Sequence, residues 1–244
     1  QAHSDSLILD GKTVRGVRFR RKGKVQKAFA QAEVLLCAGA INSPKLLELS
    51  GIGRANVLAD QGIALHHELN GVGENLQDHL QIRTVYKVTG AKTLNTMVNS
   101  FSGALPEKLL TMVNSFSGKA RMALEYGLKR SGPLSMAPSQ FGMFTKSDPS
   151  MATPDLEYHV QPLSTDRLGD PLHAYPAITM SVCNLRPESI GTCHITTSDS
   201  DTQPDIRLNY LSSDHDKRVA VTSLRQAREI MTAKALQPYA PEEV

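Results

Sequence analysis

The chain has no long apolar run. No stretch of its 244 residues approaches the roughly 20 consecutive apolar residues that a membrane-spanning helix needs. Hydrophobic residues make up 40% and charged residues 21% of the sequence, as in ordinary globular proteins. Residues 1–10 lack the pattern of a signal peptide, and position 1 is Gln rather than Met. We therefore expect residue 1 not to be the natural start of translation.

Cysteine is scarce, and its spacing is uninformative. The three cysteines are Cys37, Cys183 and Cys193, an odd number that forms no paired disulfide framework. Cys183 and Cys193 are separated by more residues than the two of a Cys-x-x-Cys metal motif. We predict free thiols in a reducing compartment and no metal site.

A large net charge is also missing. The formal net charge is +3, too small to indicate a nucleic-acid partner. One basic run stands out, because no acidic residue lies between Lys12 and Lys27. No row of aromatic residues accompanies it, which argues against single-strand binding. We interpret the run as the solvated face of a hairpin; the alternatives are a phosphate-binding patch or peripheral contact with a membrane.

The hydrophobic pattern predicts an α/β arrangement in residues 1–80. Three strands are expected at 7–9, 13–20 and 25–30, with Asp10-Gly11 as a turn. The apolar run at 33–37 predicts a buried strand that passes into small residues at 38–40. Ser43-Pro44 is then expected to begin a helix that ends at Gly51, and a second helix at 54–63 precedes a strand at 64–68.

Residues 81–244 show a different pattern. An alternating strand is predicted at 81–88, a largely helical region at 93–130, and an amphipathic helix at 214–231, after which no further element is expected. Successive predicted strands indicate an antiparallel sheet; they lie at 136–144, 155–161, 177–185, 191–196 and 206–209. The segment 96–103 recurs identically at 111–118, which we interpret as a local duplication whose residues 96–110 form a surface bulge.

Two motifs point to a family. Residues 39–53 spell Gly-Ala-Ile-Asn-Ser-Pro-Lys-Leu-Leu-Glu-Leu-Ser-Gly-Ile-Gly, and residues 71–79 spell Gly-Val-Gly-Glu-Asn-Leu-Gln-Asp-His. Together they resemble motifs of the glucose–methanol–choline (GMC) family of flavin oxidoreductases. The stretches 126–140, 181–189 and 209–212 resemble the choline dehydrogenase branch of that family.

The resemblance implies FAD as the cofactor and two domains. Residues 1–80 would be part of a Rossmann-like FAD-binding domain, and residues 81–244 a substrate-binding domain with an antiparallel sheet and helices. The chain would correspond to the middle of a family member. It lacks the Gly-x-Gly-x-x-Gly that holds the FAD pyrophosphate in the family, because Gly51-Ile52-Gly53 and Gly71-Val72-Gly73 both lack the third glycine.

The resemblance also suggests residue roles. Cys37, Ala38, Gly39 and Ala40 would contact the adenosine half of FAD, while Asn75, Asp78 and His79 would brace the flavin site. Close packing at a strand end and capping within a loop are the respective structural alternatives.

Gln140 and His173 are the candidate substrate residues, with partly buried structural polar groups as the alternative. No histidine of the chain matches the family's catalytic position. The general base is therefore expected beyond Val244, and these residues alone are expected to be inactive.

The implied reaction is FAD-dependent oxidation of a primary alcohol, choline to betaine aldehyde. A long-chain aliphatic alcohol dehydrogenase and a non-catalytic truncated module are the alternatives. The resemblance implies a location in the cytoplasm or peripherally on the inner membrane. It leaves the electron acceptor and the oligomeric state open.

Overall fold

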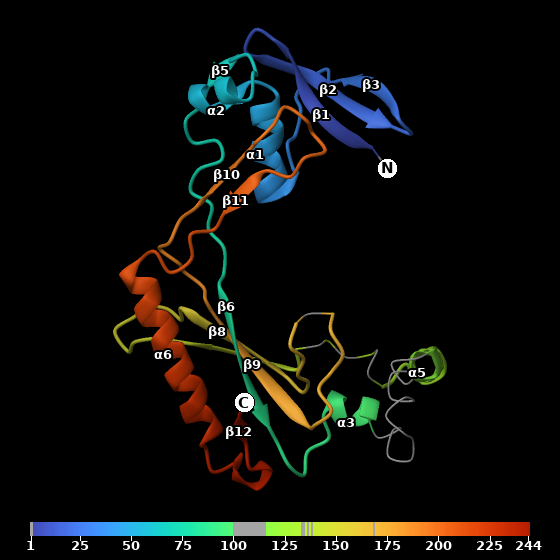
Figure 1. Ribbon diagram of the computed structural model, residues 1–244, viewed down its shortest axis with the longest axis vertical. Helices are drawn as coiled ribbons and strands as arrows, with labels where there is room; N and C mark the ends of the chain where they lie inside the picture. Colours follow the sequence, from blue (N-terminus) through green and yellow to red (C-terminus); the bar gives the residue numbers. More distant parts are fainter. Residues whose placement is uncertain (1, 100–115, 133–134, 136, 138, 168) are drawn as a thin grey trace. The chain divides into compact units, whose positions relative to one another are not determined.

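The protein forms two units in the computed structural model, which describes residues 2–99, 116–132, 135, 137, 139–167 and 169–244 (Figure 1). The first unit joins 1–78 with 187–213, and the second joins 79–186 with 214–244. The first boundary falls close to the predicted one at residue 80. The division differs from the predicted contiguous domains in that 187–213 returns to the first unit. Residues 187–213 belong to the first unit because part of this segment forms backbone hydrogen bonds with residues 71–78, as described below.

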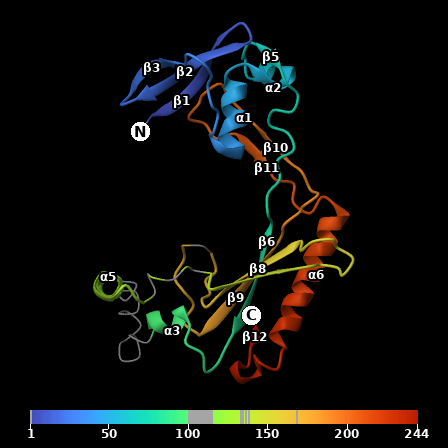
Figure 2. The ribbon, with the colours of Figure 1, turned by 180° about the vertical axis from the view of Figure 1, so that it is seen from behind.

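The first unit begins with an antiparallel three-stranded sheet (Figure 2). Its strands are β1 (His3–Asp10), β2 (Thr13–Arg21) and β3 (Lys24–Phe29). Asp10 pairs with Thr13 across the turn that begins at the predicted dipeptide, and Arg21 pairs with Lys24 across the second turn. The basic run therefore lies on a hairpin as expected, and all of β3 is exposed.

A polar network ties this sheet to the rest of the unit. Buried Asp5 accepts hydrogen bonds from Arg20 Nε at 2.9 Å and from Ser200 Oγ at 2.7 Å. Arg20 also bridges to Asp201 at 2.7 Å. Buried Lys45 donates to the Ser200 carbonyl at 2.7 Å, which gives its buried ammonium group a hydrogen-bond partner.

Helix α1 (Gly39–Leu49) follows the sheet. It begins four residues before the predicted start, with Ala38 as its N-cap and Pro44 inside it. The predicted start at Ser43 is therefore wrong: Gly39, at φ +83°, turns the chain into the helix because only glycine adopts that conformation without strain. The helix ends at Leu49, and Gly51 at φ +77° redirects the chain as predicted.

The predicted buried strand at 33–37 is absent. Residues in this segment lie outside any strand, and Leu35 is 76% exposed. A strand needs a neighbour to satisfy its backbone groups, and none of the described strands pairs with this segment. The apolar composition alone therefore gave the wrong prediction.

Short elements complete the first unit. Strands β4 (Ile52–Gly53) and β5 (His67–Glu68) pair in parallel, with α2 (Ala55–Asp60) between them. Strands β10 (Thr192–His194) and β11 (Asp205–Arg207) pair antiparallel. The elements α2, β5, β10 and β11 are each shorter than their predictions but overlap them, whereas β4 was not predicted.

The second unit is built on the predicted antiparallel sheet. Its five strands lie in the order β12-β6-β9-β8-β7, with bounds β6 (Gln81–Lys87), β7 (Phe141–Thr145), β8 (Leu156–Gln161), β9 (Ala177–Asn184) and β12 (Glu242–Glu243). No terminal element was expected, yet Glu242 pairs with Lys87. Arg228 anchors this strand through a bidentate contact with Glu243 at 2.8 and 2.9 Å. The short charged sequence of β12 alone does not predict a strand.

Helix α6 (Asp214–Met231) covers one face of this sheet and has the predicted bounds (Figure 1). Its buried stripe of Val219, Ser223, Ala227 and Met231 repeats every four residues, the spacing of one helix face. The apolar members of the stripe pack on the core residues Tyr86, Leu156, Tyr158, Met180 and Val182.

Helices α3 (Leu94–Asn99) and α5 (Phe116–Lys129) occupy the ends of the predicted helical region. Residues 96–99 of the expected 96–110 bulge belong to α3. Residues 100–110 of the bulge and most of the repeat at 96–103 and 111–118 lie outside the described residues. No helix among the described residues is both long and apolar enough to cross a bilayer.

Acid should weaken the Asp5 anchor. Burial alone would raise the pKa of Asp5, but hydrogen bonds from Ser200 and Arg20 outweigh it and hold the pKa below its ordinary value of 3.8. A carboxyl group whose pKa is lowered by folding stabilises the protein at pH values above its pKa in the unfolded state. That stability is lost as the pH falls through its pKa in the folded state. We expect Asp5→Asn to lower the free energy of unfolding by about 1.5–3 kcal/mol at pH 7, and by much less at pH 3.

Urea unfolding at both pH values measures this effect. Asp10→Asn is the matched control, because Asp10 makes an exposed pair with Arg15 at 3.2 Å and such pairs contribute little. Equal losses for Asp5→Asn at the two pH values would contradict the prediction.

Candidate functional site: a cavity where the two motifs meet

The first unit contains a cavity of about 670 Å³ between the two sequence motifs. Its volume falls within the usual range for small-molecule pockets. Helix α1 and the second motif form most of its wall, and one residue comes from β10. The lining residues are Ala40, Ser43, Pro44, Leu47, Leu69, Gly71, Val72, Gly73, Glu74, Asn75, Leu76, Gln77 and Cys193.

The start of α1 gives the cavity backbone polar groups. The N-cap residue Ala38 has no side-chain oxygen to cap the helix, and its own N–H donates to Ser43 Oγ at 3.2 Å. The first-turn N–H groups of a helix have no intrahelical acceptor. Pro44 has no N–H, so the Ala40 carbonyl lacks its i+4 donor. The same wall can therefore donate to and accept from a polar ligand, and the positive end of the helix dipole favours an anionic one.

The second motif is fixed by the returning segment. Leu76 and Gly191 exchange backbone hydrogen bonds of 3.0 and 2.8 Å, and Cys193 N–H donates to the Gly73 carbonyl at 2.7 Å. Gln77 donates to the Pro187 carbonyl at 2.8 Å. These contacts hold residues 187–193 against the second motif, with Cys193 lining the cavity, and explain why the segment belongs to the first unit.

A chain of charged side chains lies next to the cavity. Glu48 is fully buried and accepts from the Ile195 N–H at 2.9 Å. His194 Nδ1 lies 2.7 Å from Glu48 Oε1, and its Nε2 lies 3.1 Å from Glu74 Oε1. Arg54 donates to the same Glu74 oxygen at 2.5 Å. When the imidazole is protonated, each ring N–H faces its own carboxylate, and Glu74 extends this network to the cavity wall.

This network explains two motif glycines. A Cβ at Gly73 would lie 2.5 Å from both the Cys193 carbonyl oxygen and His194 Nδ1, and Gly73 also has φ +77°. A Cβ at Gly53 would lie 3.2 Å from Glu48 Cγ. These glycines make room for the protein's own network.

The predicted cofactor residues fall into three groups. Ala40 and Asn75 line the cavity, and Asn75 has φ +57°, which asparagine tolerates better than most residues. Asp78 accepts a hydrogen bond from Tyr210; burial and that bond raise the pKa of Tyr210 to about 12. His79 is exposed in the second unit, where its Nε2 lies 3.2 Å from the Leu185 carbonyl.

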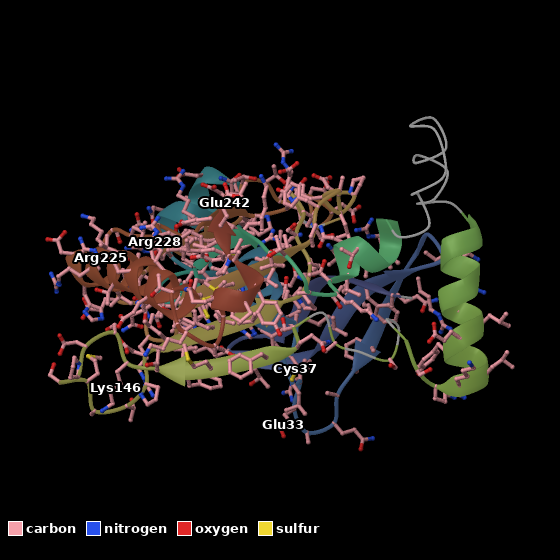
Figure 3. All side chains as sticks on the ribbon, turned by 90° about the horizontal axis from the view of Figure 1, so that it is seen from below. Glu33, Cys37, Lys146, Arg225, Arg228 and Glu242 are labelled. Carbon is pink, nitrogen blue, oxygen red and sulfur yellow. The ribbon has the colours of Figure 1, made fainter. Side chains whose placement is uncertain are left out.

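Cys37, Ala38 and Gly39 are exposed and precede the cavity-lining part of α1. Figure 3 shows Cys37 and Glu33 on the segment that leads from β3 to α1. The structure thus brings Ala40 and Asn75 to one cavity, while the other predicted cofactor residues flank it or lie in the second unit.

Both predicted substrate residues lie in the second unit and have local partners. Gln140 donates to the Ala137 carbonyl at 2.6 Å. His173 has Ser164 Oγ 2.9 Å from Nδ1 and Asp166 Oδ1 3.2 Å from Nε2. Ser164 is fully buried, so this Ser–His–Asp grouping positions the His173 ring and exposes no nucleophile.

The sequence predictions missed Glu48, Glu74, Cys193 and His194. One signal was available for Glu48: it stands within the apolar Leu46–Leu49 segment, where a carboxylate should be buried only with partners. The partners could not be inferred, since His194 and Ile195 follow 146 and 147 residues later.

The three thiols should differ sharply in reactivity. Cys37 is exposed, while Cys183 and Cys193 are buried. Burial and the nearby negative charge of Glu48 raise the pKa of the Cys193 thiol, which lowers the thiolate fraction that reacts. We expect iodoacetamide to modify Cys37 first in the native protein, as measured by peptide mass spectrometry. Rapid labelling that persists in Cys37→Ser would contradict this expectation.

Family models for GMC oxidoreductase match residues 1–81 with their N-terminal part and residues 187–244 with their C-terminal part. Two similar curated proteins are named oxygen-dependent choline dehydrogenase. The one from Photobacterium profundum is 32% identical over 98% of this chain and 39% of its own length. The one from Stenotrophomonas maltophilia strain K279a is 33% identical over 100% of this chain and 40% of its own length. The chain thus spans about two fifths of these relatives.

Solved structures show the same fold at lower identity. A formate oxidase aligns with a TM-score of 0.80 and 23% identity, over 98% of this chain and 44% of the oxidase. Pyridoxine 4-oxidase from Mesorbium loti aligns with a TM-score of 0.71 and 22% identity, over 98% and 40% of the respective chains. This likeness confirms the predicted fold class.

Proposed function

The chain belongs to the GMC oxidoreductase family, and on this premise we propose that it supplies cofactor-contacting and substrate-binding parts of an FAD-dependent oxidoreductase that oxidises a primary alcohol. The observation that carries the proposal is the cavity in the first unit, where the motif on α1 meets the motif at 71–77. Because the chain spans about two fifths of its curated relatives, the reaction is proposed for the whole protein.

The donor set of the cavity fits part of FAD. The α1 start offers uncapped N–H groups, suited to the phosphate or ribose oxygens of a dinucleotide, and the Ala40 carbonyl can accept from a hydroxyl or amino group. Leu47, Leu69 and Val72 supply apolar wall. Ala40, Ser43 and Asn75 are the residues we propose to hold the cofactor there, with Cys37, Ala38, Gly39, Asp78 and His79 as flanking candidates.

When bound, FAD supplies the acceptor for the hydride that leaves the alcohol carbon. The chain's own task at this site is positional. The Glu48–His194–Glu74 network holds α1, β10 and the second motif together through buried hydrogen bonds. A wall held in this way orients a cofactor with little loss of freedom on binding.

Choline is the proposed substrate. The support is the name oxygen-dependent choline dehydrogenase, borne by relatives that are 30–33% identical over nearly the whole chain. Gln140 and His173 are the proposed substrate residues; the contacts of His173 with Ser164 and Asp166 hold its ring in a defined orientation. The alternatives are a long-chain aliphatic alcohol as substrate, or a non-catalytic module that binds no flavin.

Filling the cavity should block FAD. We expect Ala40→Phe to weaken FAD affinity at least about tenfold, or 1.4 kcal/mol, because Ala40 lines the cavity and is exposed on α1. Quenching of flavin fluorescence on titration measures the affinity. Ala59→Phe is the matched control, since Ala59 is an exposed helical alanine outside the cavity wall.

The outcomes separate the functional alternatives. Absence of FAD binding by the whole protein would favour the non-catalytic module. If flavin binds, kcat/KM for choline and for a long-chain alcohol decides the substrate, and oxygen consumption tests the acceptor named in the relatives. Equal FAD affinity of Ala40→Phe and the unchanged protein would refute the proposed cofactor wall.

A further inference from the structure

The second unit has a polar sheet face opposite its core. On β8, Leu156 and Tyr158 point toward the core under α6, and side chains alternate along a strand. Glu157 and His159 therefore project from the other face. On β9, Met180 and Val182 belong to the core, so Cys183 also projects from the other face.

Strand pairing brings these three side chains together. Cys183 is the direct cross-strand partner of Glu157, and His159 is two residues further along the same strand as Glu157. His159 Nε2 lies 3.2 Å from Glu157 Oε1. One nitrogen, one carboxylate oxygen and one sulfur atom of the three residues all lie within 4.8 Å of one another.

We propose that Glu157, His159 and Cys183 form a three-ligand site for a borderline-soft divalent cation, Zn²⁺. Zinc accepts this combination of sulfur, nitrogen and oxygen ligands, and three protein ligands leave a fourth tetrahedral position for water. Ligand atoms around tetrahedral zinc are about 3.4–3.8 Å apart given bonds of about 2.1–2.3 Å. The 3.2 Å pair already has nearly this spacing, and small side-chain rotations would bring the third atom into range.

The surroundings favour a site over an ordinary ion pair. Cys183 is buried, and the side chains of Glu157 and His159 are only 21% and 32% exposed. Within the described part of the chain, none of the three side chains makes a hydrogen bond outside the cluster. All three are mounted on adjacent, fully paired strands, which hold ligands more firmly than loops do.

The ligand chemistry separates zinc from harder ions. Magnesium and calcium take oxygen ligands and would gain little from a thiol and an imidazole. On binding, the Cys183 thiol releases its proton to solvent and the sulfur coordinates as thiolate. The Cys-x-x-Cys criterion led to the prediction of no metal site. That criterion does not detect ligands that come from two strands distant in sequence and meet only through the sheet.

Metal titration of the purified, metal-stripped protein tests the proposal. We expect one Zn²⁺ per chain by competition with a chromophoric chelator. We also expect the Co²⁺-loaded protein to show a sulfur-to-cobalt charge-transfer band that Zn²⁺ abolishes. Cys183→Ser should remove the band and weaken Zn²⁺ binding at least about tenfold, since even outer-shell partners of metal ligands contribute 10- to 100-fold.

Cys37→Ser is the matched control and should leave the band and the affinity unchanged, because Cys37 lies in the other unit. His159→Gln and Glu157→Gln, which keep the side-chain volume, should each weaken Zn²⁺ binding. Both variants should still show the charge-transfer band, at lower intensity or at a shifted wavelength. Circular dichroism verifies that each variant is folded. No sulfur-to-cobalt band in the wild-type protein, or unchanged Zn²⁺ affinity in both glutamine variants, would overturn the proposal.

Discussion

Glu48→Ala should destabilise the first unit by about 3 kcal/mol, the loss expected when one partner of a buried charged network is removed. The fully buried carboxylate accepts from His194 at 2.7 Å and from the Ile195 N–H at 2.9 Å. The variant would leave the buried Ile195 N–H without its acceptor and the partly buried His194 ring without one of its two carboxylates, beside a new cavity. Hydrogen exchange measures the effect as lost protection in α1 and β10.

The effect should be local to that unit. Protection in β9 and α6 is expected to stay unchanged, because these elements belong to the second unit. Glu48→Gln should lose less, since its amide oxygen can still accept from the Ile195 N–H. Glu68→Ala, an exposed glutamate on β5, is the control and should change stability by no more than about 0.5 kcal/mol. If Glu48→Ala had the same hydrogen-exchange protection as Glu68→Ala, the network would make no net contribution to the stability of the first unit.

Gly73→Ala is expected to cost a similar amount, about 3 kcal/mol, for two additive reasons. At φ +77° an alanine is strained by about 1–2 kcal/mol. Its Cβ would also lie 2.5 Å from the Cys193 carbonyl oxygen, a clash with backbone that displaces β10, and overpacking typically costs about 1–3 kcal/mol. Because Gly73 lines the cavity, FAD affinity should fall together with stability in urea unfolding and flavin titration.

The neighbouring glycine provides a close control. A Cβ at Gly71 would meet no atom within 4 Å, and Gly71 is not among the glycines with positive φ. Gly71→Ala should therefore keep the stability of the unchanged protein; because Gly71 also lines the cavity, it is a control for stability alone. If the two alanine variants behave alike, the close approach of Gly73 to β10 has no energetic importance.

Elements with a long, regular pattern were predictable from the sequence. The 214–231 helix was predicted with its observed bounds because its buried stripe repeats over several turns and acidic residues occupy its first turn. The strands at 81–88, 155–161 and 177–185 were also found within a residue or so at each end, because they alternate or are continuously apolar. In each of these cases local sequence and packing favour the same structure.

Predictions failed where a distant partner decides the structure. The 33–37 segment has the composition of a buried strand but no described neighbour to pair with. Glu242 and Glu243 have poor strand propensity, yet β6 and Arg228 hold them in a strand. The motif residues were found from sequence, but their physical roles were not. Gly73 and Glu48 are explained by His194, which no local pattern connects to them.

The discontinuous first unit imposes an order on folding. Helix α1 leaves the ribosome long before its partner β10, because 146 residues separate Glu48 from His194. During that interval the Glu48 carboxylate must remain hydrated. The loop that has to close contains residues 79–186 of the second unit, and closing it carries an entropic cost that slows assembly. The core of the second unit also cannot be completed before α6 is synthesised, which happens after β10. The nascent chain therefore holds two incomplete cores at once, and its vulnerable period ends only when residues 187–231 have emerged.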